Sequence, residues 1–313
     1  MRKTAFLFPG QGAQHVGMSK DIAMLSAAAE AAFDAADTAL GRGIADIAWN
    51  GPQEELNRTE NTQPCMMAAE VAALRALTEK GIKADGVAGF SLGEWTALCA
   101  AGVLAYEQAL LLVQARAGYM QEAVPPGEGG MAVILGKTQE EAEALCAEVK
   151  EGYVAPSNLN CPGQITVAGD AVGIDAFLAL AAAEKARAKR LAVSIPSHCR
   201  LMAPAAEKLT EAMADVRFAD AVLPIYMNAT GRACTDANDI KRNMIGQLTM
   251  PVLFEQTLYN MMDDGFDTFI EIGPGKVTAG LVKKCAKARN KEVRIYSVNS
   301  AETLETCIKE LGE

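Results

Sequence analysis

The five residues Gly89-Phe90-Ser91-Leu92-Gly93 constrain the fold of this 313-residue chain more than any other segment. A short uncharged run over 86–90 leads into Ser91, and residues 94–101 after it are mostly good helix formers. A glycine two residues to either side of a serine lets the backbone turn sharply from strand to helix, which leaves the hydroxyl exposed at the sheet edge. The segment therefore predicts a nucleophile elbow centred on Ser91. The alternative is a tight structural turn in which Ser91 caps the helix.

The hydrophobic pattern predicts two structural units. Up to residue 123, apolar runs alternate with alanine-rich helical stretches, as in a mostly parallel sheet with crossover helices. Two prolines and three glycines within 124–130 cannot continue a helix and indicate a linker. The next segment predicts the βαββαβ order of a small ferredoxin-like unit. Its predicted strands are 131–135, 153–160, 164–168 and 190–193, and its predicted helices are 138–149 and 173–188.

The chain returns to the first pattern after Ile195-Pro196. An apolar run over 269–272 predicts a late strand, followed by a Gly-Pro-Gly turn and a helix that begins near Lys276. The prediction is an α/β core with a parallel sheet, formed by 1–124 and 197–313, and an inserted α+β subdomain over 125–196. Such an insertion leaves a cleft between the units, where substrates commonly bind.

The composition favours a soluble cytoplasmic protein. No stretch approaches the roughly 20 apolar residues of a membrane span, and the N-terminal apolar run stops at Pro9, too early for a signal peptide. The eight cysteines include no C-x-x-C pair, so we expect free thiols in a reducing compartment and no metal site. The net charge of −10 argues against nonspecific binding to nucleic acid.

The chain holds two histidines that could serve Ser91 as a base, His15 and His198. His198 lies at the return from the insert to the core, where it can face the cleft, so we favour it over His15. Gln11 lies between two glycines in the loop after the first strand. Its amide could donate to an oxyanion together with the amide of Leu92. A phosphate-binding or purely structural turn is the alternative for this loop.

Arg116 lies in a predicted helix over 106–122 that is apolar on nearly every side and should therefore be buried. A buried guanidinium is costly unless an anion faces it. A substrate carboxylate is one candidate, because the planar group can hold it with two parallel hydrogen bonds. An internal ion pair with a glutamate, or an arginine that reaches the rim, fits the sequence equally well.

Two clusters of basic residues could bind an acidic partner despite the negative net charge, although each could equally be a solvated helix face. The first cluster is Lys185, Arg187, Lys189 and Arg190, and the second is Lys276, Lys283, Lys284, Lys287, Arg289, Lys291 and Arg294.

Eight short motifs along the chain occur together in a fixed order. They are Phe8-Pro9-Gly10-Gln11-Gly12, Thr62-Gln63-Pro64, Gly89 to Glu94, Arg116 with Met120-Gln121, Asn160 with Pro162-Gly163-Gln164, Pro196-Ser197-His198, Gln247 with Pro251-Val252, and Glu271-Ile272-Gly273-Pro274-Gly275. With these motifs the chain resembles, over essentially its full length, the malonyl-CoA:acyl carrier protein transacylases of fatty-acid synthesis, and the number and order of the motifs make this resemblance specific.

The resemblance implies a hydrolase-like core with a ferredoxin-like insert, and a role for each matching residue. Ser91 would be acylated, His198 would be its base and Gln247 would orient His198 in place of the usual acid. Arg116 would hold the malonyl carboxylate, and the amide of Gln11 would join the oxyanion hole. Two positions depart from the family: Phe90 replaces a usual histidine, which removes a polar neighbour of the site, and Trp95 replaces a usual tyrosine.

The expected reaction is a two-step transfer without a metal or bound cofactor. Ser91 would attack the thioester of malonyl-CoA and release CoA, and the phosphopantetheine thiol of acyl carrier protein would then take the malonyl group. Carrier proteins of these systems are generally acidic, so we expect docking at the basic residues Lys189, Arg190, Lys283 and Lys284.

Two other functions share part of this pattern. A serine esterase or thioesterase has the same elbow, base and oxyanion hole, but a hydrolase of uncharged acyl groups has no need of a buried cation such as Arg116. A catalytically silent scaffold that binds carrier protein is suggested only by Phe90, and the presence of Ser91 and His198 argues against it.

Overall fold

The computed structural model describes residues 2–193 and 195–312. The strands are β1 (Lys3–Phe8), β2 (Gly86–Gly89), β3 (Gly129–Leu135), β4 (Val154–Cys161), β5 (Gln164–Asp170), β6 (Arg187–Arg190), β7 (Ile225–Tyr226), β8 (Ala233–Cys234), β9 (Phe266–Ile272) and β10 (Arg294–Val298). The helices are α1 (Lys20–Leu25), α2 (Ala27–Leu40), α3 (Ile44–Asn50), α4 (Gln53–Leu56), α5 (Thr59–Glu79), α6 (Gly93–Ala100), α7 (Tyr106–Ala123), α8 (Gln139–Glu148), α9 (Ala171–Ala183), α10 (Ala203–Met213), α11 (Ala237–Gly246), α12 (Phe254–Asp263), α13 (Val277–Ala288) and α14 (Ala301–Leu311), with a short 3₁₀ helix at Arg200–Met202.

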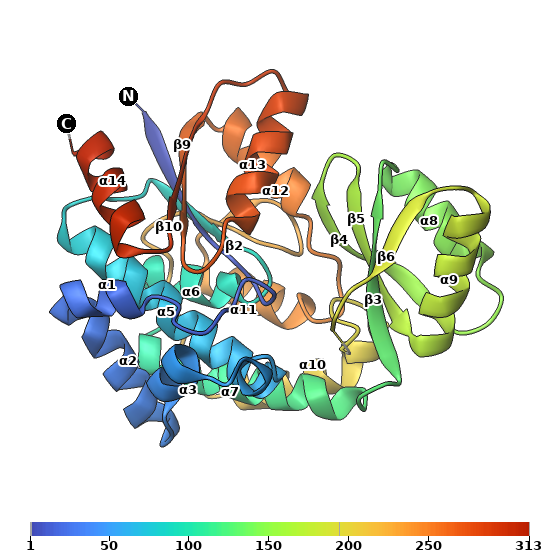
Figure 1. Ribbon diagram of the computed structural model, residues 1–313, viewed down its shortest axis with the longest axis horizontal. Coiled ribbons are helices and arrows are strands. Elements are labelled where there is room, and N and C mark those ends of the chain that lie inside the picture. Colours follow the sequence, from blue (N-terminus) through green and yellow to red (C-terminus); the bar gives the residue numbers. More distant parts are fainter. Residues whose placement is uncertain (1, 194, 313) are drawn as a thin grey trace.

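The large sheet has the strand order β10-β9-β1-β2-β7-β8. Its first five strands are parallel and β8 runs antiparallel to β7, at one edge. Residues 5–8 of β1 are all buried, as expected for a parallel strand covered by helices on both faces. The predicted α/β core with a mostly parallel sheet is confirmed. Both chain termini lie on this large unit (Figure 1).

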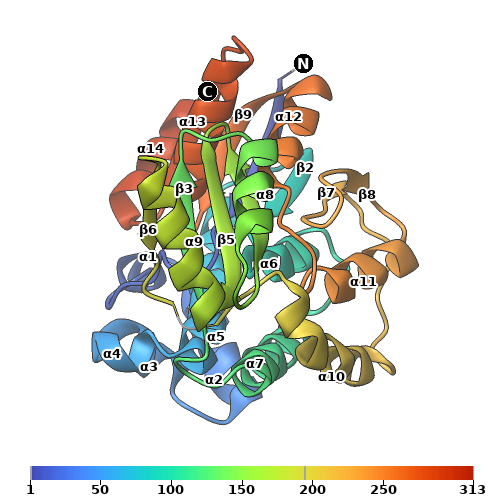
Figure 2. The same cartoon turned by 90° about the vertical axis from the view of Figure 1, so that its right-hand side faces the viewer.

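A second, antiparallel sheet of order β4-β5-β3-β6 forms the small unit predicted between the two parts of the core. This strand order, with two helices between the strands, is ferredoxin-like. Helices α8 and α9 cover the face of the sheet that points away from the large unit (Figures 1 and 2). Ala132 and Ile134 face those helices, whereas Met131 and Val133 line the cavity on the other side.

The structure corrects the end of this unit. Helix α9 ends at Ala183 rather than at 188, because Lys185 takes a left-handed conformation with a φ of 56° that an α-helix cannot continue. The last strand is Arg187–Arg190 rather than 190–193. Three of its four residues are charged, so the apolar pattern pointed to the following residues 191–193, which line the cavity instead.

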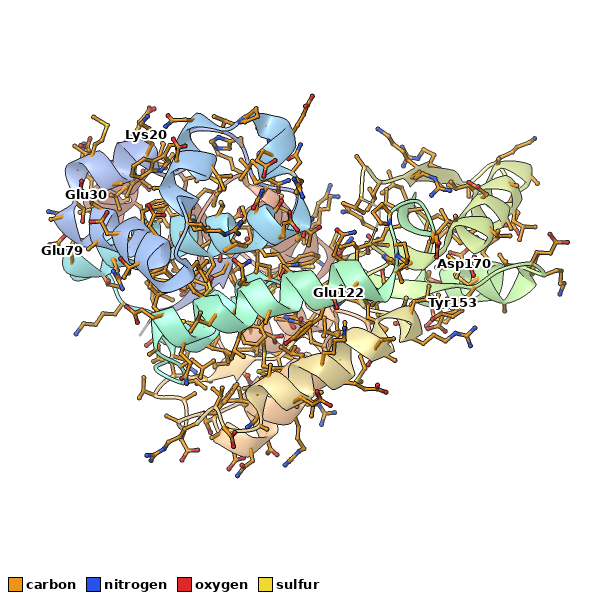
Figure 3. All side chains as sticks on the ribbon, turned by 90° about the horizontal axis from the view of Figure 1, so that it is seen from below. Lys20, Glu30, Glu79, Glu122, Tyr153 and Asp170 are labelled. Carbon is orange, nitrogen blue, oxygen red and sulfur yellow. The ribbon has the colours of Figure 1, made fainter. Side chains whose placement is uncertain are left out.

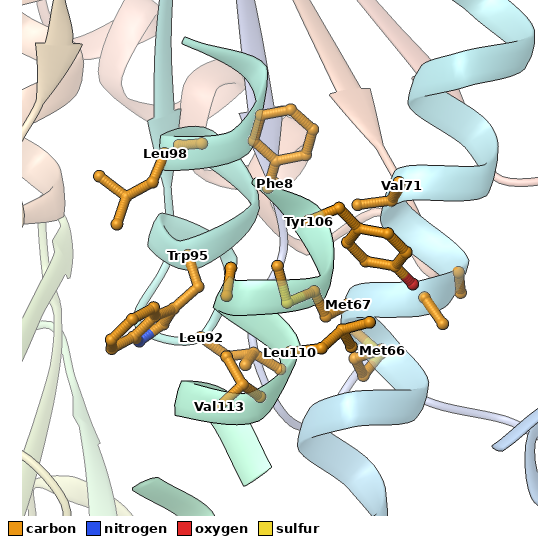
Figure 4. Close-up of a cluster of buried hydrophobic side chains, with 14 of the residues drawn as sticks. Phe8, Met66, Met67, Val71, Leu92, Trp95, Leu98, Tyr106, Leu110 and Val113 are labelled. Atoms are coloured by element: carbon orange, nitrogen blue, oxygen red, sulfur yellow. The ribbon is translucent and has the colours of Figure 1, made fainter. Parts of the chain in front are cut away.

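Apolar side chains fix α6, the helix after the elbow, against its neighbours. Leu92, Trp95 and Leu98 are fully or almost fully buried and belong to one core cluster with Met66 of α5 and Leu110 of α7 (Figure 4). Burial of such side chains contributes about 2 kcal/mol each. Helix α7 is buried over much of its length, as predicted, and runs toward the small unit, with Glu122 near that end (Figure 3).

Two further expectations concern the environment of the protein. None of the helices within 2–193 and 195–312 combines the length and the apolar character needed to cross a bilayer. All eight cysteines are free thiols, five of them buried.

Candidate active site

Ser91 lies at the sharp turn between β2 and α6. Its φ of 55° is left-handed, and the glycines around it allow this turn to pack closely. A Cβ on Gly89 would lie 2.0 Å from the carbonyl carbon of Gly93, and a Cβ on Gly93 would lie 2.2 Å from the backbone oxygen of Phe8. The cap position of α6 is Leu92, and no side chain caps the helix there. The turn is therefore built as an elbow rather than around a capping serine.

His198 is the histidine that reaches Ser91. Its Nε2 lies 2.7 Å from Ser91 Oγ, and its Nδ1 lies 2.7 Å from the backbone oxygen of Gln247. That carbonyl accepts only, so Nδ1 carries the proton and Nε2 is free to accept the serine proton. Burial, and then the charge of Arg116, lower the pKa of His198 from 6.5 to about 4, so the imidazole is neutral at neutral pH. His15 is exposed, and its ring contacts the backbone oxygen of Val16.

Gln247 supports His198 through its backbone carbonyl, while its side chain lies between three other groups. Its Oε1 accepts from Arg116 at 3.1 Å. Its Nε2 donates to the backbone oxygen of Ser91 at 2.9 Å and to Glu94 Oε2 at 2.5 Å. The residue expected to orient the histidine therefore also contacts the nucleophile and the arginine.

Arg116 is 1% exposed and points its guanidinium at the same serine. Nη1 donates to Gln63 Oε1 at 2.8 Å, and Nη2 donates to Gln247 Oε1 and, at 3.4 Å, to Ser91 Oγ. Within the described residues no carboxylate forms an ion pair with it, and its buried Nε has no partner. Burial lowers the pKa of Arg116 to about 10, and the charge of Glu94 opposes this. A charged guanidinium without a direct counter-ion beside a nucleophile is suited to bind an anion.

Gln11 and Leu92, the predicted oxyanion donors, line the cavity that Ser91 opens into. Neither backbone N–H donates to an acceptor among the described residues. The Gln11 side chain donates instead to Thr59 Oγ1 at 3.2 Å. Both backbone amides are therefore free for an incoming oxygen, which is what an oxyanion hole requires.

The cavity has a volume of about 350 Å³ and is lined by both units, where the sequence predicted a cleft. Phe90 lies in its wall and packs edge to face against Phe254, with ring centroids 5.1 Å apart. The small unit contributes polar and apolar residues to the opposite wall. These include Met131, Val133, Asn158, Asn160, Gln164 and Thr166.

Three residues of the site were given no role by sequence reasoning. Gln63 accepts from Arg116, Asn228 Oδ1 accepts from the backbone N–H of Ser91 at 2.7 Å, and the buried Glu94 accepts from both Asn228 and Gln247. Gln63 and Glu94 stand within motifs that were recognised, and their polarity in buried elements was the available signal. Asn228 follows a strand of two residues and gave no signal.

Comparison with known proteins finds relatives over nearly the whole length of the chain. The family model of the acyl transferase domain matches residues 5–311. The malonyl CoA-acyl carrier protein transacylase of Bacillus subtilis (strain 168) is 43% identical over 316 residues, covering 100% of this chain and 98% of that protein.

Solved structures agree with that match. The malonyl CoA-acyl carrier protein transacylase of Coxiella burnetii has a TM-score of 0.95 at 37% identity, covering 100% of this chain and 98% of that one. A malonyl-transacylase in complex with a type II PKS acyl-carrier protein has a TM-score of 0.94 at 38% identity, covering 98% of this chain and 99% of that one.

Proposed function

The chain belongs to the acyl transferase family, and we propose that it transfers the malonyl group of malonyl-CoA to the phosphopantetheine thiol of acyl carrier protein through a malonyl ester of Ser91. The observation that carries this proposal is that one hydroxyl, Ser91 Oγ, contacts both the base His198 and the guanidinium of Arg116. The first activates the nucleophile, and the second offers a site for a carboxylate next to the reacting carbonyl. Relatives that cover 91% to 100% of the chain carry the same activity in their names.

In the first step, His198 Nε2 takes the proton of Ser91 while Oγ attacks the thioester carbon. The backbone N–H groups of Gln11 and Leu92 stabilise the negative oxygen of the tetrahedral intermediate. The carbon–sulfur bond then breaks, and the CoA sulfur leaves with the proton from His198. Arg116 holds the malonyl carboxylate throughout, which keeps the acyl group oriented for attack.

The second step reverses the first with another thiol. The phosphopantetheine thiol gives its proton to His198 and attacks the ester, and Ser91 recovers its proton as the malonyl thioester leaves. Every proton transfer is assigned to a protein side chain, so a metal or bound cofactor has no part in the proposal. Eight free thiols suit a reducing compartment such as the cytoplasm.

The acidic carrier protein is proposed to dock at the mouth of the cavity. Lys189 pairs with Val133 and so lies on the cavity side of the small sheet. Lys284 follows Leu281 by three residues on α13, and its Nζ donates to Gln164 Oε1 across the two units at 2.7 Å. These positions favour Lys189 and Lys284 among the four predicted residues. Arg190 pairs with Asp175 of α9, and Lys283 is exposed beside Lys284.

Intact-protein mass spectrometry after brief exposure to malonyl-CoA tests the proposal. We expect a malonyl adduct on the wild type that disappears when acyl carrier protein is added, and no adduct on Ser91→Ala. Rapid release of CoA without an adduct would instead identify a hydrolase, and neither signal would favour a silent scaffold.

The variant Arg116→Ala tests how the acyl group is chosen. Removing the guanidinium should lower the rate of loading from malonyl-CoA at least 100-fold, because a charge-assisted pair to the carboxylate is lost, and should change loading from acetyl-CoA much less. Single-turnover loading with both thioesters measures the ratio. An unchanged ratio would contradict the role given to Arg116.

A further inference from the structure

Glu94 is a fully buried carboxylate one turn after the nucleophile, and the reaction proposed above gives it no part. Oε1 accepts from the backbone N–H of Asn228 at 2.6 Å, and Oε2 accepts from Gln247 Nε2 at 2.5 Å. Both oxygens therefore accept hydrogen bonds. Burial raises the pKa of Glu94 from 4.5 to about 8, because these two hydrogen bonds and the charge of Arg116 oppose the loss of solvation only in part.

The contact to Gln247 helps to fix the orientation of this amide. Glu94 Oε2 and the backbone oxygen of Ser91 both accept from Nε2, which keeps the NH₂ group on their side and the amide oxygen on the opposite side. That oxygen is the acceptor for Arg116 Nη2, which also reaches Ser91 Oγ. Glu94 thus acts on the direction of the guanidinium through one intervening amide, while Gln63 holds the other nitrogen of the same group.

The contact to Asn228 has a matching effect on the nucleophile. The Asn228 side chain accepts from the backbone N–H of Ser91 at 2.7 Å and donates to the backbone oxygen of Gly89 at 2.6 Å. These two hydrogen bonds stabilise the turn in which Ser91 adopts its left-handed conformation. Gln247 also donates to the backbone oxygen of Ser91. The peptide groups before and after Ser91 are therefore both hydrogen-bonded to side chains of residues that Glu94 contacts.

We propose that Glu94 is a positioning residue that couples the nucleophile to substrate selection: through Asn228 it holds the turn of Ser91, and through Gln247 it aims Arg116 at the carboxylate of the acyl group. The second half of this statement rests on the proposed function, and the first half does not. Glu94 touches neither the substrate nor the reacting atoms.

The variant Glu94→Gln tests the coupling because it keeps the size of the side chain and replaces one acceptor with a donor. The new NH₂ group faces a donor of Asn228 or of Gln247. If Gln247 turns over to relieve this, it presents its own NH₂ group to Arg116 and its oxygen to the carbonyl of Ser91. We expect loading from malonyl-CoA to fall about 100-fold and loading from acetyl-CoA about 10-fold, so the malonyl-to-acetyl ratio drops about tenfold.

Two further variants separate the two halves. Asn228→Ala loosens the turn but leaves Gln247 in place, so both loading rates should fall alike and the ratio should stay that of the wild type. Glu70→Gln is the matched control, because Glu70 is equally buried and accepts from Thr96 on the same helix α6 without reaching the site. It should load both thioesters at wild-type rates.

The measurements are single-turnover loading of Ser91 from both thioesters and labelling of Ser91 by an uncharged fluorophosphonate, with thermal unfolding as the check on folding. Slower labelling of Glu94→Gln and Asn228→Ala supports the first half even if the wild type takes up no malonyl group, an outcome that would overturn the proposed function alone. A malonyl-to-acetyl ratio in Glu94→Gln equal to that of the wild type would overturn the coupling. Should Glu94→Gln fail to fold, Glu94→Asp replaces it: the shorter carboxylate cannot reach Asn228 and Gln247 together, so slower labelling of Ser91 or a lower malonyl-to-acetyl ratio supports the proposal, and wild-type labelling with a wild-type ratio overturns it.

Discussion

At the scale of single residues, the two partners of the proposed proton transfer share an unusual backbone conformation. Ser91 and His198 have φ values of 55° and 63°, a region that non-glycine residues rarely occupy. Such strain persists only where surrounding contacts hold it, and it is common at functional sites. Asn228 accepts from the backbone N–H of Ser91, and the backbone carbonyl of Gln247 lies 2.7 Å from the imidazole Nδ1 of His198. The geometry of the pair is thus supported by residues that have no part in the proposed proton transfer.

The lowered pKa of His198 predicts an unusual pH profile. A neutral imidazole can accept the serine proton, and a charged one cannot. Because burial and Arg116 lower the pKa to about 4, Ser91 loading should stay constant from pH 7 to pH 5 and fall only below that, rather than near the ordinary 6.5. Single-turnover loading from acetyl-CoA, whose acyl group carries no charge, measures this profile.

The same profile in Arg116→Met separates the two causes. Removing a positive charge next to the imidazole favours its protonated form, so the pKa should rise and the fall in rate should move to higher pH by up to about one unit. A midpoint equal to that of the wild type would show that burial alone lowers the pKa. Thermal unfolding at each pH distinguishes titration from loss of the fold.

Sequence reasoning named the candidate reacting side chains and Gln247 as a support for His198, but it missed the other residues that hold the site. Ser91, His198 and Arg116 lie in short sequence patterns that indicate the chemistry of these residues. Asn228 is 137 residues from Ser91 in the chain and touches it only because β7 pairs with β2. The role of the Gln247 backbone carbonyl was equally hidden, because a backbone group leaves no trace in the side-chain sequence.

At the scale of elements, apolar periodicity located the helices and strands of the core well and failed where a strand is polar. β6 consists of Arg187, Ala188, Lys189 and Arg190, and it forms because the edge of β3 is available to pair, not because its own residues favour a strand. The turn before α6 shows the opposite case. Close backbone contacts require glycine at positions 89 and 93, and the spacing of these two glycines around Ser91 indicated the turn from the sequence alone.

Gly93→Ala tests that requirement. A Cβ at this position would lie 2.2 Å from the backbone oxygen of Phe8, so β1 and α6 must move apart. Overpacking of this kind costs roughly 1–3 kcal/mol, and loading of Ser91 should fall with it. Gly118→Ala in α7 is the matched control, because nothing lies within 4 Å of its added carbon, and it should stabilise the protein by up to about 1 kcal/mol. Urea unfolding measures both, and equal stabilities would contradict the prediction.

At the scale of the whole molecule, the inserted unit turns a sheet edge into an enclosed site. The face of its sheet that carries Met131 and Val133 forms one wall of the cavity into which Ser91 opens, and α8 and α9 cover the other face. The basic residues Lys189 and Lys284 belong to different units: Lys189 pairs with Val133, which lines the cavity, and Lys284 donates to Gln164, which also lines it. An acidic carrier protein placed there would contact both units at once and direct its thiol toward Ser91.

Charge reversal tests this arrangement. The double variant with Lys189→Glu and Lys284→Glu should lower kcat/KM for acyl carrier protein about tenfold at low salt, because attraction speeds the encounter of opposite charges. The deficit should shrink as salt rises, since the screening length falls from roughly 10 Å at 0.1 M to 3 Å at 1 M.

Loading from malonyl-N-acetylcysteamine, which carries no phosphate, should stay unchanged. Lys20→Glu, on the far side of the large unit, is the control (Figure 3). If the double variant and Lys20→Glu behave alike, the carrier protein approaches the cavity from another direction, and Lys189 and Lys284 have no part in its docking.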